Sequence, residues 1–262
     1  MSRKDYWNDQ YLEYWKKRVC EADDTENNVS EINPGDVKTG GEKVLKYLLN
    51  ELIEEEYCDK RILDVGCGFC RIYPLLSHTG IDYWGIDISE AMIERSKSMY
   101  PELSGRIQTA EIEDLTGWDS KFDYIICFGV FDACYQNKAL SSMLRMLKMK
   151  GKLLLTGKND YYYFDDERAL IAEVNARAKG HPNFFTNYRK MVKQLDNQGH
   201  NIVKQWLFER RGDFSHFNFV NEQASHFYEY ATIIQRGVGS IDFKPFSSVK
   251  SKAYLQMEEE NG

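Results

Sequence analysis

The sequence predicts an α/β protein in which helices cover both faces of a mostly parallel β-sheet. Two observations support this prediction. Short apolar segments alternate with helical segments from residue 61 to residue 157, and a glycine-rich turn directly follows the first apolar segment. The composition is that of a folded protein, because 42% of the 262 residues are hydrophobic and 29% are charged. A chain of this length can bury a large core without disulfides or a structural metal.

Two helices are expected before the alternation begins. The first is an amphipathic helix near the N-terminus, with one face formed by Trp7, Tyr11, Tyr14, Trp15 and Arg18. The acidic, turn-rich stretch 21–40 is expected to be a loop. Apolar residues at helical spacing over 42–55 predict the second helix.

The alternating region predicts five strands with helices between them. The strands are expected at 61–65, 83–88, 106–110, 124–128 and 152–157, and the helices at 72–77, 89–100 and 138–148. Ser89 is the expected N-cap of the helix at 89–100. After residue 157 the pattern predicts helices at 165–179 and 187–198, and strands at 202–209 and 229–236 that complete the sheet.

Charge and cysteine usage limit the class of protein. With 34 basic and 41 acidic residues the net charge is −7, and no strong basic cluster appears, so nucleic acid is not expected as a partner. No apolar stretch approaches the ~18 residues that span a membrane, and the N-terminus has no secretory pattern. We therefore expect a reduced, cytoplasmic protein that does not bind a membrane.

The most informative motif is the segment 63–70, with the sequence LDVGCGFC. It predicts a strand that runs into a glycine turn and then a helix, where the backbone can approach a ligand closely. Asp87, at the end of the next strand, suits a bidentate contact to a ribose diol. A dinucleotide-binding motif fits poorly, because its third glycine would fall on Arg71.

LDVGCG, followed by GIDISEAMIERSK, closely resembles the class I S-adenosylmethionine-dependent methyltransferases. The segments AEIEDL, FDYIICFGVFD and MLRMLKMKGKLLLTG fit the same family in the same order, so the resemblance covers about residues 44–157. It implies a three-layer fold with seven strands in the order 3-2-1-4-5-7-6, an N-terminal helical cap and a helical and loop insertion after strand 5. It also implies S-adenosyl-L-methionine as cofactor and S-adenosyl-L-homocysteine as product.

The chain departs from the family at two turns. Cys70 stands where a third glycine is frequent, and LKMKG stands where the family usually has LKPGG. We expect these differences to affect the geometry of the two turns rather than the cofactor.

The resemblance implies a domain organisation. A helix and loop over 1–40 form a candidate lid over the cofactor, and a single methyltransferase domain spans 41–243. An insertion at about 160–228 lies on the substrate side, and 244–262 is a C-terminal tail.

The resemblance also implies a set of cofactor-binding residues. These are Asp64, Gly66, Cys67, Gly68, Asp87, Ile88, Met92, Glu111, Ile112, Phe128 and Gly129, joined by Tyr14 and Arg18 from the first helix. Glu111 is expected at the adenine amine with Ile112 against the ring. The aromatic face of Tyr14 suits the sulfonium, and Arg18 suits the cofactor carboxylate.

Candidate catalytic and substrate residues follow the fourth and fifth strands. The candidates for a general base are His181, His216 and Asp132, although a loop histidine or a helix-capping aspartate is the plainer interpretation. The candidates for acceptor contacts are Tyr135, Lys158, Asn159 and Tyr162. No metal site is expected, because Cys67 and Cys70 lack a second ligand pair at suitable spacing.

We expect methyl transfer to a small polar acceptor, by in-line attack assisted by a general base. The preferred acceptor is a hydroxyl of a sugar or phosphorylated metabolite. The chain as a whole also resembles bacterial methyltransferases of surface-polysaccharide biosynthesis, although no single motif supports this resemblance. Phe128-Gly129-Val130-Phe131 replaces the Asn/Asp-Pro-Pro-Tyr/Phe motif of enzymes that methylate base amino groups. The alternatives are an amine acceptor, in an aminosugar or a protein side chain, and a non-catalytic cofactor-binding scaffold. The sequence leaves open whether the protein is a monomer or a homodimer.

Overall fold

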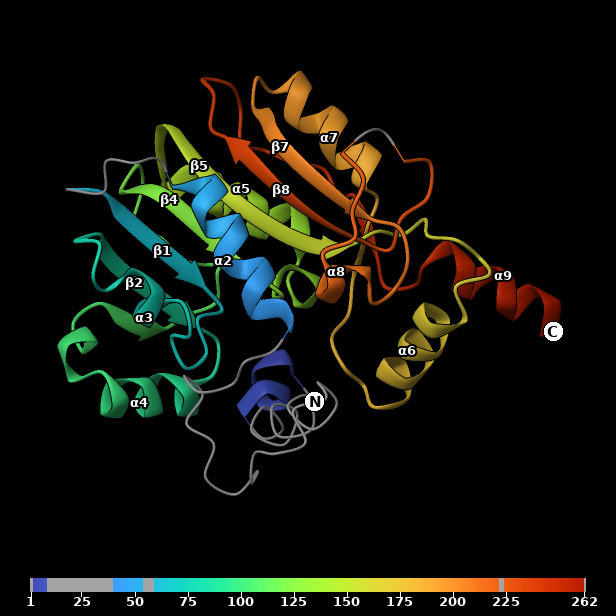
Figure 1. Ribbon diagram of the computed structural model, residues 1–262, viewed down its shortest axis with the longest axis horizontal. Helices are drawn as coiled ribbons and strands as arrows, with labels where there is room; N and C mark the ends of the chain where they lie inside the picture. The colour runs from blue at the N-terminus through green and yellow to red at the C-terminus, as the bar shows by residue number, and fades with distance from the viewer. Residues whose placement is uncertain (1, 9–39, 54–58, 222–223, 262) are drawn as a thin grey trace. The chain divides into compact units, whose positions relative to one another are not determined.

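The computed structural model describes residues 2–8, 40–53, 59–221 and 224–261 (Figure 1). Residues 3–8 are helical, as expected for the start of the first helix. Tyr11, Tyr14, Trp15 and Arg18, and with them the expected loop up to residue 39, lie outside the described residues. The chain divides into two compact units, one up to Glu111 and one from Ile112 onward.

The first unit alternates helices and parallel strands. Its elements are α2 (Gly40–Leu52), β1 (Arg61–Val65), α3 (Tyr73–Leu76), β2 (Asp82–Asp87), α4 (Glu90–Met99), a 3-10 turn (Pro101–Leu103) and β3 (Ile107–Thr109). Strand β2 pairs in parallel with β1 on one side and with β3 on the other. Strand β1 is almost wholly buried, which explains why most of its residues are apolar.

The second unit begins with the same alternation and then changes. Its elements are β4 (Phe122–Cys127), a 3-10 turn (Phe131–Ala133), α5 (Gln136–Met146), β5 (Leu147–Lys158), α6 (Glu167–Ala178), β6 (Phe185–Thr186), α7 (Tyr188–Asn197), β7 (Asn201–Phe208), α8 (Asp213–His216), β8 (Glu229–Gln235), β9 (Ser247–Ser248) and α9 (Lys252–Asn261). Strand β5 pairs in parallel with β4, whereas β8 lies antiparallel between β5 and β7 (Figure 1).

The predicted fold class is confirmed. The strand order is β3-β2-β1 in the first unit and β4-β5-β8-β7 in the second, which matches the predicted 3-2-1 and 4-5-7-6 because β6 belongs to a separate small sheet. Ser89 caps α4 as expected, with its side chain accepting a hydrogen bond from the backbone N–H of Met92. None of the described helices is long and apolar enough to cross a membrane.

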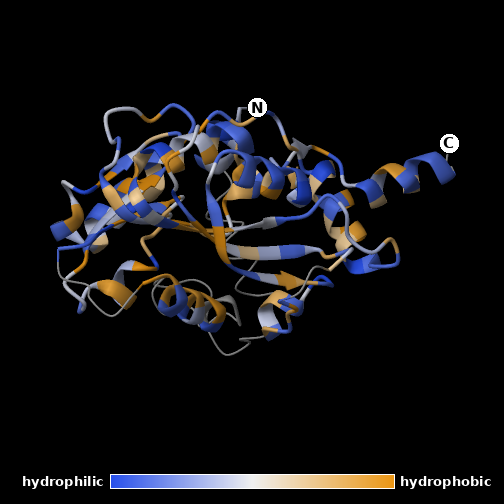
Figure 2. Cartoon of the chain, turned by 90° about the horizontal axis from the view of Figure 1, so that it is seen from above, coloured by the Kyte–Doolittle hydropathy of each residue, from blue (hydrophilic) through white to orange (hydrophobic). Residues whose placement is uncertain are grey.

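The C-terminal segment holds two elements that the sequence pattern does not reveal. Strand β9 pairs antiparallel with β6, and α9 packs near α6 although its end is mainly hydrophilic (Figure 2). Ser251, just before α9, donates hydrogen bonds through its N–H and its hydroxyl to the buried carboxylate of Glu173 on α6. The segment after residue 244 therefore contributes to the core of the second unit.

Both turns that depart from the family pattern keep a left-handed backbone. Cys70 has φ +55°, beside Gly66 at +72° and Gly68 at +52°. Lys150, which stands in place of a glycine in the other turn, has φ +63°. The missing glycines therefore leave two non-glycine residues in a conformation that L-residues adopt at a cost of about 1 kcal/mol each.

Candidate functional site

The glycine turn after β1 is fixed to the neighbouring strand. The N–H groups of Gly66 and Cys67 both donate to the carbonyl oxygen of Ile86, at 2.8 and 2.9 Å. The hydroxyl of Ser96, on α4, donates to the carbonyl oxygen of Gly68 at 2.8 Å. The turn is thus held in a defined shape by β2 and α4.

Asp87 links the glycine turn to the start of α4. One carboxylate oxygen accepts the N–H of Gly68 and the other accepts the N–H of Ser89, each at 2.8 Å. Burial raises the pKa of Asp87, although these backbone donors oppose the change. A carboxylate can accept about four hydrogen bonds, so Asp87 keeps acceptor capacity for hydroxyl groups of a ligand.

Asp64 lies on β1 and is also buried. Its carboxylate accepts a hydrogen bond from the hydroxyl of Tyr83, on β2, at 2.8 Å. Burial raises the pKa of Asp64 to about 7, and the Tyr83 hydroxyl opposes this increase. Asp64, one of the expected cofactor-binding residues, therefore links β1 to β2 through its side chain.

The N-terminal helix contributes contacts that the sequence did not reveal. Arg3 forms an ion pair with Glu111 at 2.9 Å, and Asn8 accepts a hydrogen bond from the hydroxyl of Ser89 at 2.9 Å. Glu111, expected at the adenine amine, thus has a cationic partner in the same unit. Arg3 and Asn8 thus contact residues that follow the ends of β3 and β2.

Ile88 and Met92 lie close to this turn along the chain. Ile88 follows Asp87 and is half-buried, whereas Met92 is fully buried in the first turn of α4. Cys67 and Cys70 are both buried and reduced. Among the described residues, no group of three His, Cys, Asp or Glu side chains is arranged to hold a metal ion.

In the second unit, Asp132 and Lys158 form the principal charged pair. Asp132 follows β4 and Lys158 ends β5, and the ammonium nitrogen lies 2.9 Å from the carboxylate. The backbone N–H of Lys158 also donates to Asp132, at 2.9 Å. Asn183 accepts a hydrogen bond from the same ammonium group at 3.1 Å.

Lys158 remains a cation at neutral pH. Burial by itself lowers the pKa of this ammonium group, but the negative charge of Asp132 more than offsets the effect, and the pKa is raised above its ordinary value. Lys158 is therefore unsuited to act as a base. Asp132 is the member of the pair that can accept a proton.

Three further expected residues belong to the second unit. Ile112 is buried, and Phe128 is half-buried directly after the strand. Gly129 has φ +69°, donates its N–H to the hydroxyl of Thr156 at 2.8 Å, and has open space where a Cβ would project. This opening is consistent with the close approach of a ligand.

The two candidate histidines lie on different segments. His181 is half-buried just after α6, where its N–H donates to the carbonyl oxygen of Ala176. His216 is the exposed last residue of α8, the helix whose Phe214 contacts Phe128. His216 thus lies on an element that packs against the end of β4, while His181 is two residues from Asn183.

The candidate acceptor residues divide into two groups. Tyr135 is 50% exposed, and its ring packs against Phe184, whose N–H donates to the carbonyl oxygen of Asp132. Tyr135 and Lys158 thus lie near Asp132.

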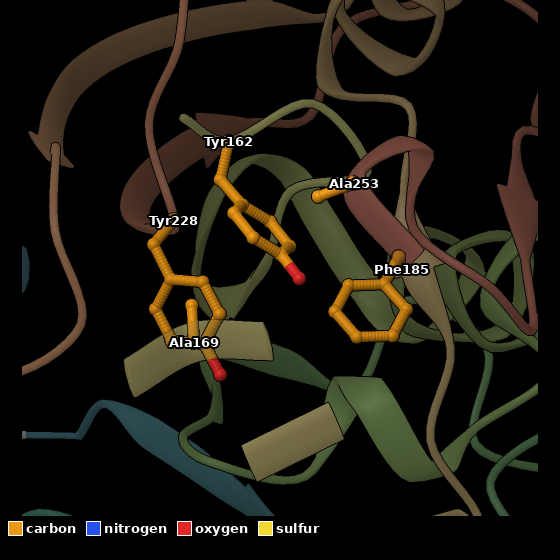
Figure 3. Close-up of a cluster of buried hydrophobic side chains, with 5 residues drawn as sticks. All are labelled: Tyr162, Ala169, Phe185, Tyr228 and Ala253. Atoms are coloured by element: carbon orange, nitrogen blue, oxygen red, sulfur yellow. The ribbon is translucent and has the colours of Figure 1, made fainter. Parts of the chain in front are cut away.

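Asn159 and Tyr162 are instead buried, with their polar groups bonded within the chain. The amide of Asn159 donates to two backbone carbonyl groups. The Tyr162 hydroxyl donates to Glu173, and its ring packs in a buried cluster with Tyr228 and Phe185 (Figure 3). These contacts favour a structural role for both residues over a contact with the acceptor.

Comparison with known proteins agrees with this arrangement. Residues 63–155 match the family model of a methyltransferase domain, which includes the glycine turn, Asp87 and strand β4. This match, over about a third of the chain, agrees with the resemblance to the class I S-adenosylmethionine-dependent methyltransferases.

Individual relatives match at moderate identity. An uncharacterized protein of Methanocaldococcus jannaschii is 34% identical over 127 residues, which is 45% of this chain and 53% of that protein. The chloroplastic magnesium protoporphyrin IX methyltransferase of Arabidopsis thaliana is 27% identical over 217 residues, covering 81% of this chain and 68% of that protein. With the Methanocaldococcus protein, the chain aligns over about half of that protein's length.

The fold recurs in solved structures. The [4+2]-cyclase SpnF superposes with a TM-score of 0.60 at 15% identity, covering 91% of this chain and 98% of that one. At such low identity the likeness concerns the fold alone.

Proposed function

We propose that this protein transfers a methyl group from S-adenosylmethionine to a small-molecule acceptor. The single observation that carries the proposal is the buried carboxylate of Asp87, which bonds to the N–H of Gly68 in the glycine turn and to the N–H of Ser89 at the start of α4. This contact places an acidic acceptor beside a turn that suits close approach of a cofactor.

The residues of the first unit fit the cofactor. Asp87 keeps acceptor capacity for the ribose hydroxyls, and Gly66 and Gly68 place no side chains of their own on the left-handed backbone of the turn. Glu111 can accept from the adenine amine while it is paired with Arg3. When bound, S-adenosylmethionine supplies an activated methyl group, so the protein needs no nucleophile of its own.

The residues of the second unit fit an acceptor that carries a hydroxyl group. The Asp132 carboxylate is the group that accepts the hydroxyl proton, and the Lys158 ammonium stabilises the negative charge that develops on the oxygen. Lys158 also orients Asp132 through two hydrogen bonds. Positioning of the acceptor accounts for the rest of the catalytic effect.

The sequence analysis favoured a sugar or phosphorylated metabolite as acceptor. This is one of several acceptor classes to be tested. The names of two relatives point to other compounds. The Arabidopsis protein is named for magnesium protoporphyrin IX, and a Coxiella burnetii O-methyltransferase is named for ubiquinone biosynthesis. The acceptor screen therefore includes sugar phosphates, amines and aromatic hydroxyl compounds.

A non-catalytic scaffold is the second candidate function. The observation that motivates it is that the same fold carries a different named activity in a [4+2]-cyclase, so the fold by itself does not establish methyl transfer. The two functions differ in one result: a scaffold binds S-adenosylhomocysteine but produces none from S-adenosylmethionine with any acceptor.

The first test is thermal and chemical unfolding with S-adenosylhomocysteine, and separately with NAD. A ligand at 100 times its dissociation constant stabilises the folded protein by about 2.7 kcal/mol. We expect stabilisation by S-adenosylhomocysteine and none by NAD. Asp87→Asn should weaken the binding at least about tenfold, whereas the exposed control Asp242→Asn should leave it unchanged. Stabilisation by NAD alone would refute the proposal.

A further inference from the structure

Three phenylalanine rings follow one another across the end of the sheet in the second unit. The Phe214 ring, on α8, has its centroid 5.7 Å from that of Phe128 and 4.8 Å from that of Phe208. Phe128 follows β4 and Phe208 ends β7, the first and last strands of the order β4-β5-β8-β7. The Phe214 ring of α8 therefore lies between the ring that follows β4 and the ring that ends β7.

Charged residues lie at the same edge of the two strands between these rings. Lys158, at the end of β5, is the register partner of Glu229 on β8, which in turn is the register partner of Phe208 on β7. Neighbouring strands lie about 4.8 Å apart, so the backbones of Lys158 and Phe208 are about 10 Å apart. The apolar rings and the ion pair thus lie at the same edge of the sheet, where β4, β5 and β7 end.

The ion pair keeps capacity for a ligand. An ammonium group has three N–H donors, and among the described residues Asp132 and Asn183 engage two of those of Lys158. The Lys158 and Asp132 side chains are 19% and 17% exposed, so solvent reaches both. A hydroxyl group can therefore accept from Lys158 and donate to Asp132 at the same time.

The rings determine what kind of molecule can carry that hydroxyl. Phe128 and Phe214 are half-buried, and their side chains offer no hydrogen-bonding group. A sugar placed against them would lose the hydrogen bonds of its other hydroxyl groups to water without replacement. An aromatic ring instead gains from burial and from ring contacts, worth about 0.5–1.5 kcal/mol beyond the buried area.

We propose, on the basis of the methyl transfer proposed above, that the acceptor is a phenol. Its aromatic ring lies against Phe128 and Phe214, and its hydroxyl group bonds to the Asp132–Lys158 pair. Phe214 is then a specificity-determining residue, because it selects an aromatic acceptor over a sugar.

The proposal is tested by binding of 4-nitrophenol to the full chain saturated with S-adenosylhomocysteine, measured by isothermal titration calorimetry. We expect saturable binding that Phe214→Ala weakens about tenfold or more. Phe164→Ala is the matched control, because Phe164 is 46% exposed and packs against Tyr161, away from this row in the chain. The control variant should bind within about twofold of the parent protein.

A second comparison tests the hydroxyl contact. Nitrobenzene has the same ring and nitro group without the hydroxyl, so it should bind about tenfold more weakly than 4-nitrophenol. Lys158→Met should largely remove this difference. Phe214→Leu keeps an apolar side chain, and it carries the ring test if Phe214→Ala does not fold.

The outcomes separate this proposal from the proposed function. If S-adenosylhomocysteine binds but 4-nitrophenol does not, or if Phe214→Ala and Phe164→Ala weaken its binding equally, the phenol proposal is overturned and methyl transfer stands. Displacement of 4-nitrophenol by glucose 6-phosphate at comparable concentration would also overturn it. If S-adenosylhomocysteine itself does not bind, the proposed function fails first.

Discussion

Replacing Asp64 by asparagine should change how the stability of the protein depends on pH. The Asp64 carboxyl has an ordinary pKa of 3.8, which burial raises to about 7 in the folded protein. The unfolded chain therefore loses this proton near pH 4, whereas the folded protein keeps it until about pH 7. Between these values the unfolded state binds fewer protons, so stability falls as the pH rises and levels off above about pH 7.

The magnitude follows from the size of the shift. Between pH 5 and pH 7 the penalty grows by two pH units at about 1.4 kcal/mol each, or about 3 kcal/mol. The amide side chain of the Asp64→Asn variant cannot ionise, and its oxygen can still accept the hydrogen bond from Tyr83. We therefore expect the stability advantage of Asp64→Asn over the parent protein to grow by about 3 kcal/mol between pH 5 and pH 8.

Urea unfolding at several pH values between 5 and 8 measures this difference. The contributions of other titrating groups cancel when the variant is compared with the parent protein at each pH. Asp242→Asn, at an exposed position, is the control and should follow the parent curve. A difference between Asp64→Asn and the parent that stays constant within about 1 kcal/mol over this range would refute the reasoning.

Three other substitutions test the turns and the C-terminal contacts. Lys150→Gly should stabilise the protein by about 0.5–1 kcal/mol, since exposed Lys150 has φ +63°, whereas Lys152→Gly, in the part of β5 that pairs regularly with β4, should destabilise it by a similar amount in the same urea assay. Cys70→Gly should change stability by less than about 1 kcal/mol, because relief of the φ +55° backbone is offset by loss of a fully buried side chain. Glu173→Gln should cost about 2 kcal/mol and speed hydrogen exchange in α9, because the N–H and the hydroxyl of Ser251 bond to different carboxylate oxygens and an amide has only one oxygen; unchanged exchange would contradict this role.

The local pattern of the sequence was sufficient for most of the main sheet. Strands such as β1 and β4 are short apolar runs between helices, and their bounds in the structure lie within two residues of the prediction. Ser89 could be assigned as an N-cap because its capping contact reaches only three residues ahead, to Met92. Features set by neighbours in the chain were therefore predictable.

Contacts between distant segments were not predictable in this way. Strands β6 and β9 have two residues each, and α9 is anchored by a bond between Ser251 and Glu173. Such short elements have no recognisable periodicity, and a lone buried glutamate gives no sign of its partner. For the same reason Tyr162 was predicted at the substrate, although its hydroxyl bonds to that glutamate.

The candidate site shows the same division. Asp87 and the glycine turn were predictable because one strand and one turn position them, and Lys158 and Asp132 were named because each follows a strand end. That Lys158 and Asp132 form a pair depends on the alignment of β4 and β5, and the contact of Arg3 with Glu111 depends on a segment more than one hundred positions away in the sequence. The residue types were visible in the sequence, whereas their partners were not.

The two turns without the family's glycines show why a departure from a motif need not change the structure. Gly66 and Cys67 are bonded to Ile86, and Gly68 to Asp87, so the backbone path is already determined before position 70 is reached. Cys70 then takes φ +55° at a cost of about 1 kcal/mol, which is small beside the several hydrogen bonds that hold the turn. A glycine in a motif thus marks a backbone conformation that is easiest for glycine. Whether another residue can adopt that conformation depends on how firmly the surrounding contacts hold the turn.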